Sequence, residues 1–276
     1  GAASATPWLY LAAGALLLAA SLQVLARQRE GFTLVIVLGG ACWVIGTALW
    51  AFGAPVYRVV AWWIAFLVLT IAGERLELSR FLPPSVTARR AFAGIVVLLL
   101  GSLAAWPLAG APHAFGMALL ALAAWLLKQD IARRTVKQQG LTRFIAVCLL
   151  SGYFWLAVGG GVIAFAGLAP GNPAYDAALH ALLLGFVFSM VFGHAPIIFP
   201  AVLRVAVPYH PVFYAPLALL HLSLAVRLAG DLAGLADWRS LGGLLNALAL
   251  AAFILNTIAA VIRGKFSRQA ANRQRN

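Results

Sequence analysis

Charged residues, and acidic residues above all, are scarce in this sequence. Of the 276 residues only 10% are charged, and 7 Asp and Glu stand against 20 Lys and Arg. Hydrophobic residues make up 63% of the chain, whereas a soluble domain is typically about half apolar and about a quarter charged. The composition therefore excludes an ordinary cytosolic enzyme and a disordered chain.

Sulfur-containing residues are equally rare, with two cysteines and two methionines. Cys42 and Cys148 lie in apolar stretches and form no CxxC pair, which excludes a disulfide framework. We interpret both as small buried hydrophobic residues. The sequence also lacks HxH, HxxxH and HExxH motifs and Met-rich clusters, which would have indicated a particular metal site.

Long apolar runs are abundant, and they do not alternate as the strands of a membrane barrel would. Because backbone groups in lipid must be satisfied within the segment, apolar runs of about 20 residues predict transmembrane helices. We therefore predict an all-α, polytopic helical bundle with nine spans, forming a single transmembrane domain over residues 1–276. The predicted spans are 7–26, 32–53, 55–73, 91–109, 112–129, 142–168, 175–203, 211–229 and 240–263.

The net charge of +13 follows from topology and does not indicate nucleic acid. If the N-terminus lies outside, 17 of the 20 Lys and Arg residues fall in breaks on the inner side. The exceptions are Arg58, Arg227 and Arg239. We therefore predict that the N-terminus is outside, the C-terminus is inside and the lipid bilayer is the main partner. The first span lacks a positive n-region and is interpreted as an anchor, not a cleaved signal peptide.

Five histidines contrast with this apolar background: His113, His180, His194, His210 and His221. An ionisable residue inside a membrane is a functional hypothesis by default, although each imidazole alone could simply bond a neighbouring helix. His180 and His194 are 14 residues apart in one span. In a continuous α-helix this spacing places them within about 40° of one face and about 21 Å apart along the axis.

Depth sorts four of the histidines into an outer pair, His113 with His180, and an inner pair, His194 with His221. Imidazole is the usual axial ligand of haem iron, so we expect one or two b-type haems that carry electrons. The 14-residue spacing resembles that of dihaem cytochrome b bundles. A copper or other transition-metal centre at His194 and His221, with His210, is the alternative, because ligand type alone does not decide.

Arginine, proline and tryptophan residues also differ from the apolar background of the spans. Arg58 and Arg227 lie at outer span ends, where they would pair with haem propionates or extend to lipid phosphates. Pro196 and Pro200 each remove a helical hydrogen bond, which predicts either a shaped cavity or a packing kink. Trp155 and several other tryptophans fit an interfacial aromatic belt.

Part of the chain resembles a known family. The stretch Gly152-Tyr-Phe-Trp-Leu-Ala157, the element His180-Ala-Leu-Leu-Leu-Gly185, and Arg204 with His210 resemble the NnrS family over residues 152–210. These are polytopic bacterial membrane proteins that bind haem and copper and are linked to nitric-oxide stress. The resemblance implies haem or metal binding at His180 and a multi-pass protein of the bacterial inner membrane.

Three functions therefore stay open. The first is a haem-binding membrane redox protein, an oxidoreductase or a binder of nitric oxide or oxygen, with a redox protein or quinol as partner. The second is a solute transporter or channel with its site at the proline-broken seventh span, since broken helices are typical of transporter sites. The third is a non-catalytic membrane subunit that anchors or assembles a larger redox complex. The chain could also form a homo-oligomer.

Overall fold

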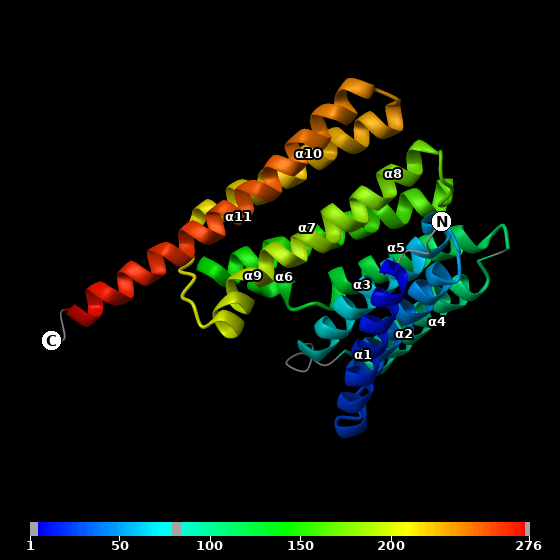
Figure 1. The fold of residues 1–276 in the computed structure, drawn as a ribbon, viewed down its shortest axis with the longest axis horizontal. Coiled ribbons are helices and arrows are strands. Elements are labelled where there is room, and N and C mark those ends of the chain that lie inside the picture. The colour runs from blue at the N-terminus through cyan, green and yellow to red at the C-terminus, as the bar shows by residue number, and fades with distance from the viewer. Residues whose placement is uncertain (1–4, 79–83, 107, 274–276) are drawn as a thin grey trace. The chain divides into compact units, whose positions relative to one another are not determined.

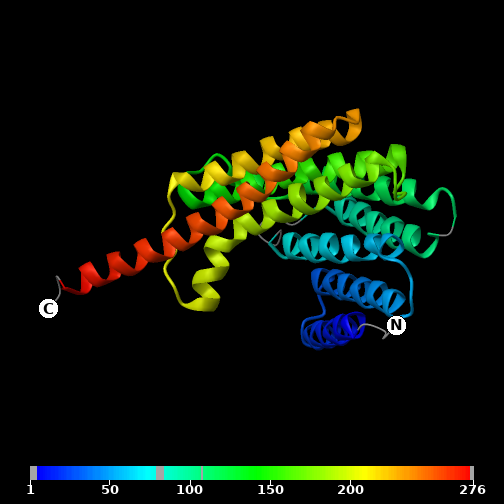
Figure 2. The ribbon, with the colours of Figure 1, turned by 45° about the horizontal axis from the view of Figure 1, so that its top comes forward.

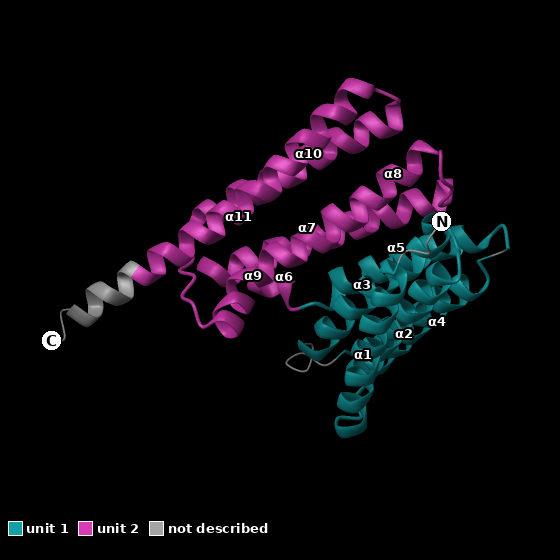
Figure 3. Ribbon diagram, in the orientation of Figure 1, with its two compact units in different colours: residues 1–130 teal, residues 131–276 magenta. Residues whose placement is uncertain are grey.

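A computed structural model describes residues 5–78, 84–106 and 108–273. These residues form helices without strands, and nine helical segments among them are long and apolar enough to cross a membrane (Figure 1). The all-α class and the nine predicted spans are confirmed. The helices divide into two compact units, residues 1–130 and 131–276, which are described separately (Figure 3). The single domain over 1–276 stays a prediction.

Unit 1 contains five spanning helices, α1 to α5. Their first turns carry the expected signals, with Pro7 and Pro112 at the starts of two of them and a Ser85 cap on α4. α2 packs between α1 and α3, and α4 packs on α5. The bounds are α1 Thr6–Arg27, α2 Gly31–Ala51, α3 Val56–Leu78, α4 Val86–Ala104 and α5 Ala111–Gln129.

The fourth span differs from its predicted bounds of 91–109. It begins five residues earlier because the Ser85 hydroxyl accepts a hydrogen bond from the Ala88 N–H over 3.2 Å and so caps the helix. Two arginines, Arg89 and Arg90, therefore lie inside the first turns of α4. The hydropathy pattern placed the helix start after these charges, whereas the cap places it before them.

Unit 2 contains four spanning segments. Figures 1 and 2 show α7 lying along the α8–α9 segment, and α10 and α11 forming an antiparallel hairpin. α10 also packs against α8 and the segment that follows it. The bounds are α6 Ala132–Thr135, α7 Gly140–Ala166, α8 Pro173–His180, η2 Ala181–Val187, α9 Phe188–Leu203, η3 Pro211–Phe213, α10 Tyr214–Ala233 and α11 Ala236–Arg273.

Local sequence explains the breaks in unit 2. Asn172 caps α8 by accepting a hydrogen bond from the Ala174 N–H over 3.0 Å, and Pro173 occupies the first turn. Gly234 ends α10 in the left-handed conformation, with φ of 69°, which favours glycine. The interior is apolar, and the Phe192 and Phe253 rings stack there with centroids 3.8 Å apart. Cys42 in unit 1 and Cys148 here are free and buried, as predicted.

Candidate functional site

The seventh span is not a continuous α-helix. α8 ends at His180, and residues Ala181–Val187 form a π-helix before α9 resumes the α-helical pattern. Such segments form hydrogen bonds five residues apart and frequently occur at functional sites. One additional residue per turn shifts the register by about 100°. The prediction that His180 and His194 share one face assumed an uninterrupted α-helix, and the π-helix removes that assumption.

Gly185 lies inside the π-helix and gives the Trp155 side chain of α7 room to approach. A Cβ atom at this position would clash with Cβ and Cγ of Trp155 and would also crowd Leu224 of α10. Three helical segments therefore meet around one glycine. Trp155 is buried here, with 6% of its surface exposed, so its assignment to an interfacial aromatic belt was wrong.

His221 of α10 lies beside this junction and forms hydrogen bonds through both ring nitrogens. The Trp155 indole N–H donates to Nδ1 over 2.9 Å, and Nε2 lies 2.9 Å from the Ser151 hydroxyl oxygen. Since an indole nitrogen only donates, Nδ1 is the acceptor and the neutral imidazole carries its proton on Nε2. Ser151 then accepts from Nε2 and donates to the Cys148 carbonyl over 3.1 Å. We call Ser151, Trp155 and His221 the imidazole triad.

The imidazole triad places His221 at the level of the π-helix. His194 follows Gly193, whose Cα packs against Cys148 of α7. His221 contacts α7 at Ser151 and Trp155, about five residues further along, or about 7 Å. The two histidines are therefore next to different turns of α7, and their pairing at one depth stays a prediction.

His180 and His194 each form a hydrogen bond to the carbonyl one turn earlier in the helix. Nδ1 of His180 lies 2.7 Å from the Asp176 carbonyl oxygen, and Nδ1 of His194 lies 2.6 Å from that of Met190. A carbonyl only accepts, so Nδ1 carries the proton in both rings, and in the neutral form the lone pair is on Nε2. Backbone carbonyls orient metal-binding imidazoles in this way.

A charged cluster lies one turn before His180, formed by Asp176 of α8, Arg227 and Asp231 of α10, and Arg239 of α11. The carboxylate of Asp231 is completely buried and forms ion pairs with both guanidinium groups. Its Oδ2 accepts a hydrogen bond from Nε of Arg227 over 3.2 Å, and its Oδ1 lies 2.7 Å from Nε of Arg239. Arg239 also contacts the Asp176 carboxylate at 2.9 Å. Two positive and two negative charges balance, as burial near lipid requires.

Arg227 therefore lies at the same end of unit 2 as His180. Its Nη2 is 3.9 Å from the carboxylate of Asp176, the residue whose carbonyl accepts from the His180 ring. The sequence predicted that Arg227 and His180 lie at the same end of the bundle, because both fall at the outer ends of their spans. It did not predict that Arg227 would already be paired with Asp231.

The other candidate residues lie elsewhere. His210 is exposed and caps the short helix Pro211–Phe213 by accepting from the Val212 N–H. His113 and Arg58 belong to unit 1, where both are exposed, and the Arg58 guanidinium lies 6.0 Å from the centre of the Tyr57 ring. Across residues 5–78, 84–106 and 108–273, no three His, Cys, Asp or Glu side chains group closely enough to hold a metal ion.

Two pairs among the residues that were missed have a spacing that could have indicated them. Arg227 and Asp231 are four residues apart on one helix, a spacing that predicts an ion pair. Ser151 and Trp155 have the same spacing and therefore share a face of α7. The π-helix has no comparable signature, apart from Gly185.

Family comparison places the whole set of spans in one family. The chain belongs to the family described as Domain of unknown function (DUF8744), whose family model matches residues 1–262. No curated protein and no solved structure matches the chain. The match covers both units, including the imidazole triad and the charged cluster.

Proposed function

We propose that this chain is a haem-binding integral membrane redox protein in which His180 is an axial ligand. A single observation carries the proposal: the ring of His180 is held by the Asp176 carbonyl with the proton on Nδ1, so that Nε2 presents its lone pair. This is the tautomer and the orientation that metal-binding histidines adopt. The resemblance of residues 152–210 to the NnrS family supports the same assignment.

The charged cluster supports a haem whose propionates lie at that end of unit 2. Arg239 is 42% exposed at its side chain and already contacts the half-exposed Asp176 carboxylate, so this fork is placed to bind carboxylates. Arg227 is more deeply buried and held by Asp231. We therefore assign Arg239 to propionate binding and Arg227 to positioning Arg239, through the hydrogen bond from Nη1 of Arg227 to the Arg239 carbonyl.

The imidazole triad has a positioning role in this proposal. Both nitrogens of His221 are bonded to protein groups, so this ring holds α7 and α10 together around the π-helix. When bound, the haem would supply one-electron chemistry or a site for a small gas such as nitric oxide or oxygen. The chain itself supplies the Nε2 ligand and the orienting Asp176 carbonyl. His194, with the same ring orientation as His180, is the candidate for a second haem.

A difference spectrum tests this proposal. The chain is purified in mild detergent after expression with haem supplementation, and the reduced-minus-oxidised spectrum is recorded. We expect a Soret band and an α-band, and His180→Ala removes the contribution of the haem at His180, whereas a second haem at His194 keeps its own. His210→Ala is the matched control, because this imidazole is exposed at a helix start and its loss leaves both bands unchanged. Absence of both bands from the wild-type chain would refute the proposal.

Solute transport is the second candidate, and the broken seventh span favours it. A π-helix at Ala181–Val187 and two prolines in α9, Pro196 and Pro200, interrupt the regular hydrogen bonds of this segment. Interrupted helices near polar side chains are typical of transporter sites. Flux into proteoliposomes that is lost in Ser151→Ala, together with a wild-type chain that binds no haem, would favour transport over redox function.

A further inference from the structure

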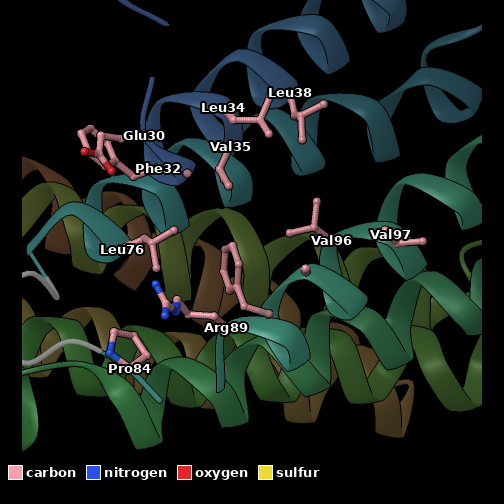
Figure 4. Close-up of a pocket in the computed structure, with 13 residues that line it drawn as sticks. Glu30, Phe32, Leu34, Val35, Leu38, Leu76, Pro84, Arg89, Val96 and Val97 are labelled. Carbon is pink, nitrogen blue, oxygen red and sulfur yellow. The ribbon is translucent and has the colours of Figure 1, made fainter. Parts of the chain in front are cut away.

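A groove opens within unit 1 between α2 and α4, and its volume is about 640 Å³. Apolar side chains line most of it, with Leu34, Val35 and Leu38 from α2 and Phe92, Val96 and Val97 from α4 (Figure 4). The volume falls within the range of about 300–1,000 Å³ that is typical of small-molecule sites. The groove is separate from the residues assigned to haem, all of which belong to unit 2.

Polar side chains occur at one end of the groove only. Figure 4 shows the Arg89 guanidinium between Leu76 and Pro84, on the same side as Glu30, whereas Val96 and Val97 lie toward the other end. α2 begins at Gly31 and α4 begins at Val86, so both helices start at this polar end. Eight residues separate Arg89 from Val97, which gives the apolar part a length of about 12 Å.

The electrostatics of the polar end favour an anion. Arg89 is exposed and contributes a full positive charge, and the N-termini of α2 and α4 add partial positive charges. Glu30 is the acidic lining residue, but its side chain accepts a hydrogen bond from the Thr33 N–H in a capping box, which holds it against the end of α2. Arg27 and Arg29 precede it in the chain and are exposed.

We propose that this groove binds one anionic phospholipid, with an acyl chain between α2 and α4 and the phosphate at Arg89. An apolar channel that ends in one guanidinium matches a molecule with a hydrocarbon tail and an anionic head. Basic pockets between transmembrane helices bind anionic lipid headgroups in this way. The proposal adds a lipid site to the proposed function and does not depend on haem.

Native mass spectrometry of the full chain tests the proposal. The protein is purified in neutral detergent, delipidated and titrated with phosphatidylglycerol or with phosphatidylcholine of the same acyl chains. We expect one phosphatidylglycerol to be retained at about five-fold lower lipid concentration than phosphatidylcholine, because the choline group neutralises the phosphate charge and one arginine near an anionic lipid is worth about 1 kcal/mol. Equal retention of the two lipids would overturn the assignment of the headgroup.

Two matched pairs of variants locate the site. Arg89→Gln removes the charge that lines the groove, and Arg90→Gln removes the same charge from the next residue, which is exposed and does not line it. We expect Arg89→Gln to abolish the preference for phosphatidylglycerol and Arg90→Gln to retain it. Equal loss in both variants would mean that the basic surface attracts the lipid in general, and this would overturn the proposal.

The second pair tests the acyl chain. Ala93→Trp fills the apolar part of the groove, whereas Ala91→Trp adds the same side chain at an exposed position of α4 outside it. We expect Ala93→Trp alone to lose the retained lipid. Size-exclusion profiles and thermal unfolding in detergent confirm that all four variants fold, and retention of lipid by folded Ala93→Trp would contradict the proposed position of the chain.

Discussion

The indole N–H of Trp155 donates a hydrogen bond to Nδ1 of His221, with 2.9 Å between the two nitrogen atoms. The two residues are 66 positions apart and join α7 to α10 beside the π-helix. Since the indole cannot accept, it fixes the proton of the neutral imidazole on Nε2, and Ser151 receives that proton's hydrogen bond. A single tryptophan thus sets the tautomer of a histidine within the membrane-spanning part of unit 2.

Replacement of Trp155 by phenylalanine removes this donor while retaining an aromatic ring. We expect the His221 imidazole to lose its fixed Nε2–H tautomer, because Nδ1 no longer accepts a hydrogen bond. The loss of one partner in a half-buried network costs about 1–3 kcal/mol. Nitrogen-15 chemical shifts of the His221 ring in detergent report the tautomer directly.

Trp125→Phe is the matched control for this measurement. The Trp125 indole also donates a hydrogen bond, to the Ala88 carbonyl over 2.8 Å, but it lies in unit 1. Its replacement leaves the His221 ring shifts unchanged. Identical ring shifts in wild type and Trp155→Phe would contradict the assigned hydrogen bond.

Gly185 is the position at which the π-helix admits Trp155. Gly185→Leu forces a side chain into the space of the indole, and overpacking of this kind costs about 1–3 kcal/mol. We expect a lower free energy of unfolding in mixed micelles and a change in the His221 ring shifts. Gly94→Leu, at an α4 position with open space around it, leaves both unchanged. Equal free energies of unfolding and equal His221 ring shifts in the two variants would mean that the contact between Gly185 and Trp155 does not determine how α7 packs against the π-helix.

The spans were predictable because lipid imposes a local rule: a long apolar run must satisfy its own backbone. The start of α4 was not predictable from hydropathy, because the Ser85 cap places two arginines inside the helix. The site was less predictable for two reasons. The Trp155–His221 contact depends on how α7 and α10 pack, and the orientation of His180 relative to His194 depends on the π-helix between them. Of the contacts at the site, the Arg227–Asp231 ion pair is the one that the spacing of the two residues along a helix is enough to predict.

Asp231 is the most deeply buried acid of the charged cluster, because its side chain has no exposed surface while two guanidinium groups contact it. Asp231→Asn leaves Arg227 and Arg239 without this countercharge. Removal of one partner from a buried ion pair costs about 3–5 kcal/mol, so we expect a large loss of free energy of unfolding. Mixed-micelle denaturation of the purified chain measures it.

Asp176→Asn provides the comparison within the same cluster. Its side chain is 42% exposed, so the ion pair with Arg239 is screened by solvent and is worth less than about 1 kcal/mol. The carbonyl that accepts from His180 belongs to the backbone and is kept. If Asp176→Asn lowers the free energy of unfolding as much as Asp231→Asn does, burial does not determine the strength of these ion pairs.

The two ends of α7 test the predicted orientation of the chain. Ala169 follows α7 and Gln138 precedes it, and both are exposed. With the N-terminus outside, Ala169→Cys reacts with a membrane-impermeant maleimide on intact cells, whereas Gln138→Cys reacts only after lysis. The native thiols stay silent because Cys42 is 1% and Cys148 0% exposed. The opposite pattern would reverse the orientation, and labelling of both from one side would contradict α7 as a span.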